Sequence, residues 1–246
     1  LKITNPTELK ICDPACGSGH ILVYAFDLLF EIYKESGYTD DDIIVENILK
    51  HNLYGIEIDE RASELAAFAL AMKAASKTGS KRRFFRKPIE VNICKLENIK
   101  FDNEEIHKYM NVVGRNLFTT DLQTTLNQFE EADNFGSLIQ PALQDVTSIF
   151  KILQENKKLN QDMFLASTHE KVLKVLKQTD YLTQKYHIVV ANPPYMGSKG
   201  MNKELSDFLK KSYPDSKSDL FAAFIERGLE FIKENGYMAM ITMQSW

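Results

Sequence analysis

The feature that most constrains the fold of this chain is an apolar run, a turn of small residues and an apolar segment in direct succession. Residues 9–12 form the apolar run, and residues 21–33 place apolar side chains at helical spacing. A strand, a glycine turn and a helix in this order open an α/β fold of the dinucleotide-binding type. We therefore expect a doubly wound, mostly parallel sheet. The turn comprises Asp13, Pro14, Ala15, Cys16, Gly17, Ser18, Gly19 and His20.

This turn favours a ligand with a cationic or amino end. Gly17 and Gly19 allow a positive φ and a close approach of the backbone to a ligand, and the helix N-terminus offers free N–H groups. No glycine stands three residues after Gly19, and the segment lacks the Gly-Lys-Ser/Thr of a phosphate-binding loop. Asp13 instead places a carboxylate where those loops hold a phosphate.

Two further strands end in polar residues. Residues 52–59 predict a second strand, followed by a helix over residues 60–76. In a nucleoside-binding fold an acid at this strand end takes the ribose hydroxyls, so we assign Glu57 to the ribose and Ile58 to the flank of the adenine ring. Residues 89–96 predict the third strand, and Glu97 and Asn98 follow it, where such folds contact the base of the ligand.

A strand that ends in Asn-Pro-Pro-Tyr supplies the second motif. Residues 188–191 are apolar and β-branched, and they lead directly into Asn192, Pro193, Pro194 and Tyr195. The prolines stiffen the backbone and leave only carbonyl acceptors, and the tyrosine adds a flat aromatic face. Such a site suits a planar ring that carries an amino group. The alternative is a strand that ends in a proline turn with a capping asparagine.

Residues 101–184 differ from the rest of the chain. They carry Gln, Asn and Glu with Leu and Phe at helical spacing, and they predict a helical insertion between the third and fourth strands. We therefore divide the chain into a ligand-binding half over residues 1–100, this insertion, and a catalytic half over residues 185–246. His107 and His169 are expected at the surface.

Basic residues occur in two places. Residues 81–87 combine Lys and Arg with two phenylalanines, for which a solvated loop is favoured over a phosphate contact. Residues 196–202 predict a mobile loop of small residues, in which Ser198 and Lys199 could hold a phosphate or simply be solvated. A helix over residues 219–233 and a final strand over residues 237–242 follow.

Composition bounds the partners of the chain. It has 30 basic and 34 acidic residues, so any grip on a duplex must be local or come from other parts. Three cysteines form no disulfide framework and indicate a reducing, cytoplasmic setting. The sequence shows no membrane span and no metal-binding spacing. Because the chain stops just after an apolar strand, we expect it to be a fragment of a longer protein.

Together, the two motifs resemble those of amino-group DNA methyltransferases of the adenine-N6 class. Residues 13–19 are similar to the S-adenosylmethionine motif, and residues 192–195 are similar to the catalytic motif. The order of the motifs is that of the gamma-type enzymes. Residues 17–22, 96–99 and 135–139 look most like the adenine methyltransferases of BREX phage-defence systems, whose relatives include methylase–nuclease fusions of restriction systems.

This resemblance implies a Rossmann-like fold, S-adenosylmethionine as cofactor and a flipped adenine of double-stranded DNA as substrate. Asp13 and the glycine turn would hold the methionine portion, Glu57 the ribose, and Glu97 or Asn98 the adenine of the cofactor. The catalytic residues would be Asn192, Pro193, Pro194 and Tyr195. Other defence-system or restriction subunits are the expected partners, and no metal is expected.

Two alternatives to DNA methylation stay open at this point. Methyltransferases that act on a protein glutamine or an RNA base also use Asn-Pro-Pro-Tyr. A non-catalytic scaffold could also retain the fold as a cofactor sensor. A helical segment before the first motif and a target-recognition domain are the family parts that we do not find in residues 1–246, so we expect weakened cofactor binding in this fragment.

Overall fold

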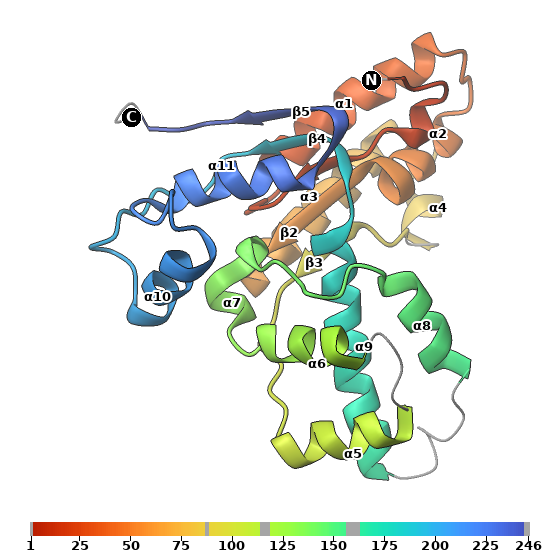
Figure 1. Cartoon of the computed structure of the whole chain (residues 1–246). Coiled ribbons are helices and arrows are strands. Elements are labelled where there is room, and N and C mark those ends of the chain that lie inside the picture. Colours follow the sequence, from red (N-terminus) through yellow and green to blue (C-terminus); the bar gives the residue numbers. More distant parts are fainter. Residues whose placement is uncertain (1, 87–88, 114–118, 156–162, 244–246) are drawn as a thin grey trace. The chain divides into compact units, whose positions relative to one another are not determined.

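The computed structural model describes residues 2–86, 89–113, 119–155 and 163–243. It contains a five-stranded parallel sheet (Figure 1). Its strand order is β3-β2-β1-β4-β5, and each neighbouring pair is parallel. The predicted doubly wound α/β fold is confirmed. The strands are β1 (Ile11–Asp13), β2 (Leu53–Glu57), β3 (Asn92–Lys95), β4 (Tyr186–Ala191) and β5 (Ile232–Met240).

Helices connect the strands as the sequence predicts, including the helical insertion between β3 and β4, with one correction: residues 81–86 are helical, where a solvated loop was predicted. Before β3 lie η1 (Pro6–Glu8), α1 (His20–Glu35), α2 (Asp41–Asn47), η2 (Ile48–Asn52), α3 (Glu60–Lys77) and α4 (Lys81–Arg86). The insertion holds α5 (Asn103–Val113), α6 (Thr119–Gln128), α7 (Ala132–Phe135), η3 (Gly136–Leu138), α8 (Val146–Glu155) and α9 (Met163–Thr183). Between β4 and β5 lie α10 (Lys203–Ser212) and α11 (Leu220–Phe231).

The chain divides into two compact units. Residues 1–95 and 185–246 form the first, which we call the sheet unit, and residues 96–184 form the second, which we call the helical unit. The functional division of the sheet unit into a cofactor-binding half and a catalytic half stays a prediction.

The core of the sheet unit fixes β1 against its neighbours. One face of α1 is buried, with Leu22, Phe26 and Leu29 fully enclosed, so the helix packs firmly onto the sheet. The buried side chain of Asn52 donates to the carbonyls of Pro6 and Leu9 and accepts from the hydroxyl of Tyr33. These bonds hold the segment before β1 and place the start of the glycine turn.

The final strand departs from the predicted pattern. It begins at Ile232, five residues earlier than expected, and Asn235 interrupts it with a φ of 61°. The register shifts between the pairs Tyr186–Ile232 and Ile188–Tyr237, after which pairing continues to Met240. The regular part of β5 thus coincides with the start of the predicted strand.

The helical unit corrects one prediction. His169 is not a surface residue: it is buried, and its Nδ1 lies 2.8 Å from the hydroxyl of Tyr109, which is also buried. A polar ring can occupy this interior because Tyr109 satisfies it. Burial lowers the pKa of His169. His107 is exposed, as predicted. None of the helices in the described part of the chain is long and apolar enough to cross a membrane.

Candidate active site

The two sequence motifs lie at the same edge of the sheet. Asp13 ends β1 and Asn192 follows β4, and these strands are neighbours with Cys12 paired to Val189. Because the strands are parallel, their carboxyl ends meet at one edge, where ligands bind in open α/β folds. Glu57 ends β2 on the other side of β1. The edge therefore gathers a buried carboxyl, a second carboxyl and an exposed amide.

The glycine turn needs its glycines for different reasons. Gly17 and Gly19 both have positive φ values, 52° and 81°. A Cβ on Gly19 would lie 3.0 Å from the Cα of Ala66, whereas one on Gly17 would meet nothing within 4 Å. Open space at Gly17 is what a close ligand requires. Helix α1 begins directly after Gly19 without a side-chain cap, so its N-terminus can receive a polar or anionic group.

Glu57 has a role that the sequence did not indicate. Its Oε2 accepts from the N–H of Gly17 at 2.7 Å, and its Oε1 accepts from the N–H groups of Ile58 and Asp59 at 2.9 and 3.0 Å. Glu57 thus fastens the glycine turn to the end of β2. A carboxylate has about four acceptor positions, so one is left for a ligand hydroxyl. Ile58 is 41% exposed beside it, available to an aromatic ring.

Asp13 is nearly fully buried, with 1% of its surface exposed. Its Oδ1 accepts from the N–H of Ala15 at 3.1 Å. Burial raises the pKa of Asp13 to about 7, and the charge of Glu57 adds to the shift. A cation placed against this carboxyl would favour its ionised form and lower the pKa. An ammonium group is thus a kind of ligand that would stabilise the ionised carboxylate.

This buried carboxyl predicts a pH-dependent stability difference. The pKa of Asp13 in the folded protein lies above the unfolded value of about 3.9. Between about pH 4 and pH 7 the unfolded chain therefore gives up this proton while the folded protein keeps it, so rising pH destabilises the folded state. Asp13→Asn keeps an oxygen for the Ala15 N–H and removes this charge. We compare the free energy of unfolding of the variant with that of the wild type at each pH. The advantage of the variant should be about 2–4 kcal/mol larger at pH 8 than at pH 4. Urea unfolding at both pH values measures it, and a difference that is constant with pH would contradict the assignment.

The Asn-Pro-Pro-Tyr stretch is held from two sides. The hydroxyl of Tyr195 lies 2.9 Å from Asn192 Oδ1 and 3.1 Å from the carbonyl of Ile241. The N–H of Ile241 donates to the carbonyl of Ala191 at 3.0 Å, which ties the motif to the end of β5. Pro193 is buried, whereas Asn192 is exposed. The Asn192 amide is therefore held in place but open to a substrate.

Phe221 supports the aromatic face of the motif. Its ring meets that of Tyr195 edge to face, with centroids 6.3 Å apart, a geometry favoured by the ring quadrupoles. Phe221 is buried in α11, whereas Tyr195 is 43% exposed. One side of the Tyr195 ring is supported while much of it stays open. The apolar spacing of residues 219–233 was the signal for this helix, but not for this contact.

The two candidates after β3 are engaged within the helical unit. The N–H of Glu97 donates to Gln178 Oε1 at 2.9 Å, and its carboxylate lies 3.7 Å from Lys174 Nζ. Asn98 Oδ1 accepts from the N–H of Asp133 at 3.0 Å. Their contact with a cofactor stays a prediction.

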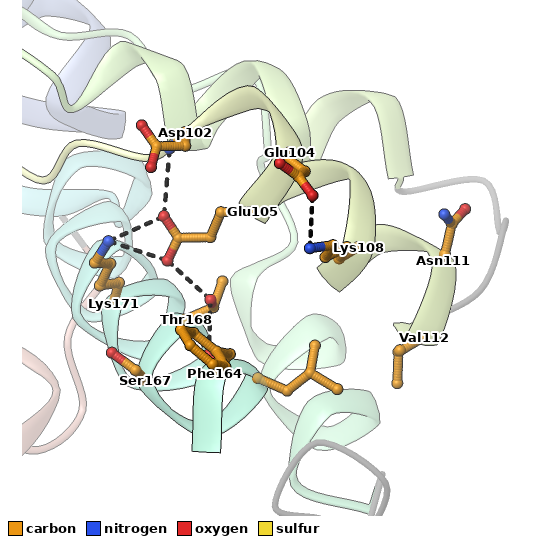
Figure 2. Close-up of a pocket in the computed structure, with 11 residues that line it drawn as sticks. Asp102, Glu104, Glu105, Lys108, Asn111, Val112, Phe164, Ser167, Thr168 and Lys171 are labelled. Atoms are coloured by element: carbon orange, nitrogen blue, oxygen red, sulfur yellow. Dashed lines mark hydrogen bonds and ion pairs between the residues drawn. The ribbon is translucent and has the colours of Figure 1, made fainter. Parts of the chain in front are cut away.

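The helical unit has a pocket of its own, of about 820 Å³, between α5 and α9 (Figure 2). Lys171 Nζ lies 3.0 Å from both carboxylate oxygens of Glu105, and Lys108 pairs with Glu104 at 2.6 Å. Thr168 also donates to Glu105 at 2.8 Å. These carboxylates are committed to local partners and form no acid–base pair. Among the described residues, no cluster of His, Cys, Asp and Glu could hold a metal ion.

Comparison with known families shows which family the chain belongs to. The family model described as Eco57I restriction-modification methylase matches residues 51–246, and the model described as N-6 DNA Methylase matches residues 1–87. The chain belongs to the Eco57I restriction-modification methylase family. The predicted resemblance to adenine-N6 methyltransferases is thereby confirmed.

Curated relatives of this methylase family match nearly the whole length of this chain. Adenine-specific methyltransferase BrxX of Escherichia coli O9:H4 (strain HS) is 39% identical over 98% of this chain and 22% of its own length. Adenine-specific methyltransferase PglX of Lacticaseibacillus casei (strain Zhang) is 37% identical over 97% of this chain and 20% of its own length. The chain thus spans about a fifth of these relatives. A chain in a solved structure of a DrdV–DNA complex matches with a TM-score of 0.49 and 16% identity. The match covers 97% of this chain and 17% of that chain.

Proposed function

We propose that this chain is the methyltransferase core of an adenine-specific DNA modification enzyme in a phage-defence or restriction–modification system. It transfers a methyl group from S-adenosylmethionine to the N6 amino group of adenine. The observation that carries the proposal is the exposed Asn192 amide at the edge of the sheet where Asp13 and the glycine turn lie. Relatives named adenine-specific methyltransferases support the choice of adenine.

The cofactor assignment rests on the fit of the residues present. Asp13 would hold the ammonium group of the methionine portion, and the N-terminus of α1 its carboxylate. The remaining acceptor position of Glu57 would take a ribose hydroxyl, with Ile58 beside the adenine ring. When bound, S-adenosylmethionine supplies a methyl group activated by a sulfonium charge.

The Asn-Pro-Pro-Tyr residues would activate the substrate amine. The lone pair of the N6 nitrogen is delocalised into the adenine ring, so this nitrogen is a poor nucleophile. Asn192 Oδ1 and the Pro193 carbonyl accept its two hydrogens, which lets the nitrogen pyramidalise and attack in line. The nitrogen would lose one of its protons to water once it carries the methyl group, because Asn192 Oδ1 would accept a hydrogen bond and not the proton itself. The contribution of the protein is positioning and electrostatic stabilisation.

Two substitutions of Tyr195 distinguish the contribution of its ring from that of its hydroxyl. Removing the ring in Tyr195→Ala should weaken binding of a duplex with a flipped target base by about 1–3 kcal/mol, because stacking is lost. Tyr195→Phe keeps the ring and loses only the hydrogen bonds of the hydroxyl to Asn192 and to the carbonyl of Ile241, each worth about 1 kcal/mol. Fluorescence of 2-aminopurine at the target position reports flipping in both variants. Equal losses in the two variants would contradict a stacking role.

A cofactor titration and a substrate comparison test the function. Calorimetry of the complete protein should show S-adenosylmethionine binding that Asp13→Ala loses, since the buried carboxyl is its proposed cation partner. A labelled methyl group should then enter duplex DNA and not RNA or a protein glutamine. Transfer to RNA or protein would overturn the substrate, and cofactor binding without any transfer would indicate a scaffold.

A further inference from the structure

The loop after Tyr195 is fastened to the turn before α11. The N–H of Ser198 donates to the carbonyl of Ser218, and the N–H of Leu220 donates to the carbonyl of Met196, both at 3.0 Å. Gly197 and Asp219 form an antiparallel bridge between these bonds. We call residues 196–200 and 216–220 the paired loops. They give this region more backbone pairing than a mobile loop would have, and they begin directly after the proposed catalytic motif.

Four exposed lysines lie in and beside the paired loops. Lys199 and Lys217 are exposed, and each lies one residue beyond the Ser198–Ser218 bond. Lys203 and Lys211 are exposed as well. Both belong to α10, which lies in the segment between the two loops (Figure 1). In the described residues, no ion pair joins any of these four to an acid. Lys199 and Lys217 therefore carry exposed positive charge outside any ion pair of the described residues. By contrast, Lys210 and, more weakly, the charge of Lys203 lower the pKa of Asp207, and the exposed acids Glu204 and Asp215 lie in the same segment.

Three acids in and beside the same segment have local partners. Asp219 caps α11, accepting from the N–H of Phe221 at 3.4 Å. Asp207 pairs with Lys210 at 3.0 Å, and Ser216 donates to Glu226 at 2.7 Å. None of these contacts is an ion pair with Lys199 or Lys217.

Lysines at the opposite edge of the sheet are different. Lys34 in the last turn of α1 pairs with Asp41, and Lys50 in η2 pairs with Glu46. Exposed pairs such as these contribute little to stability, so the contrast concerns available charge. Unpaired like charges held on joined backbones repel each other, and an anion between them would relieve that repulsion.

We propose that Lys199 and Lys217 hold phosphate groups of the DNA strand that carries the target adenine, with Lys203 and Lys211 extending the contact. The proposal rests on the proposed function and adds the grip on the backbone. A flipped base stays joined to its strand, so the flanking phosphates must pass close to Asn192 and to the paired loops that follow Tyr195. Phosphate contacts position a protein on DNA without reading sequence. These lysines would therefore place the strand, and other parts would choose the site.

The salt dependence of DNA binding tests this assignment in the complete protein. In Lys199→Gln/Lys217→Gln, the slope of log affinity against log salt concentration should shrink by about 1.8, or about 0.9 for each phosphate contact. The loss should be uniform across DNA sequences, while S-adenosylmethionine affinity and the melting temperature stay those of the wild type. Lys34→Gln/Lys50→Gln makes the same charge change at the opposite edge and should leave the slope unaltered.

Two results would overturn the proposal. One is a wild-type slope in the double variant, and the other is an equal change in both double variants, which would indicate a general charge effect. Failure of the proposed function gives a different pattern. In that case the wild type would methylate no DNA, while the slope would still report on the lysines.

Discussion

Replacing Asn192 with alanine is expected to lower single-turnover methyl transfer by about 10²–10³-fold and to leave S-adenosylmethionine binding unchanged. Asn192 Oδ1 is exposed at the end of β4 and oriented by the hydroxyl of Tyr195 at 2.9 Å. Alanine removes the acceptor for the substrate amine but touches none of the bonds that hold the glycine turn. The effect should therefore fall on the rate constant of the chemical step, as measured by rapid quench of labelled methyl transfer.

Asn202 provides a matched control. It lies ten residues further on and caps α10, with its Oδ1 accepting from the N–H of Leu205 at 2.8 Å. Asn202→Ala should cost about 1 kcal/mol of stability and leave the rate constant near that of the wild type. Similar rate losses in both variants would show that disturbance of this region, and not loss of a specific acceptor, lowers activity.

Gly19→Ala is expected to lower the free energy of unfolding by about 2–5 kcal/mol. The φ of 81° costs an alanine about 1–2 kcal/mol. In addition, its Cβ would lie 3.0 Å from the Cα of Ala66, a backbone atom that cannot swing away, and such overpacking costs about 1–3 kcal/mol. Because Gly19 precedes α1, the same displacement should weaken cofactor binding. Urea unfolding and calorimetry measure the two effects.

Gly37 separates the two causes. Its φ of 90° imposes a similar conformational cost, but a Cβ there would meet nothing within 4 Å. We expect Gly37→Ala to cost only about 1–2 kcal/mol and to leave cofactor binding unchanged. If both variants lost the same stability, close packing of the glycine turn against α3 would not be the reason for Gly19.

Local pattern was sufficient to predict most of the sheet unit. Consecutive residues around Asp13 form the strand, the glycine turn and the helix, so a local pattern indicates all three. The positive φ values of Gly17 and Gly19 agree with the turn that these glycines predict. The start of β5 was not predictable, because the turn at Asn235 arises from a register shift against β4. That shift depends on pairing across 46 residues of sequence, from Tyr186 to Ile232.

Contacts between residues far apart in the sequence could not be predicted either. The clamp of Glu57 on Gly17 joins residues 40 positions apart, and its strand end indicated only an acid near a ligand. His169 is buried because Tyr109, 60 positions earlier, satisfies its ring. The contact of Phe221 with Tyr195 likewise needs the packing of α11 against the end of β4. Each case concerns which groups meet, which the spacing of residues does not specify.

The chemical identity of the modified nucleoside tests the central claim most directly. Duplex DNA would be incubated with the complete protein and S-adenosylmethionine labelled in the methyl group, beside Asn192→Ala, then digested to nucleosides and separated. The account predicts that the label appears in N6-methyladenine with the wild type and falls by at least about 10²-fold with the variant. Label in N4-methylcytosine, or equal labelling by both proteins, would contradict it.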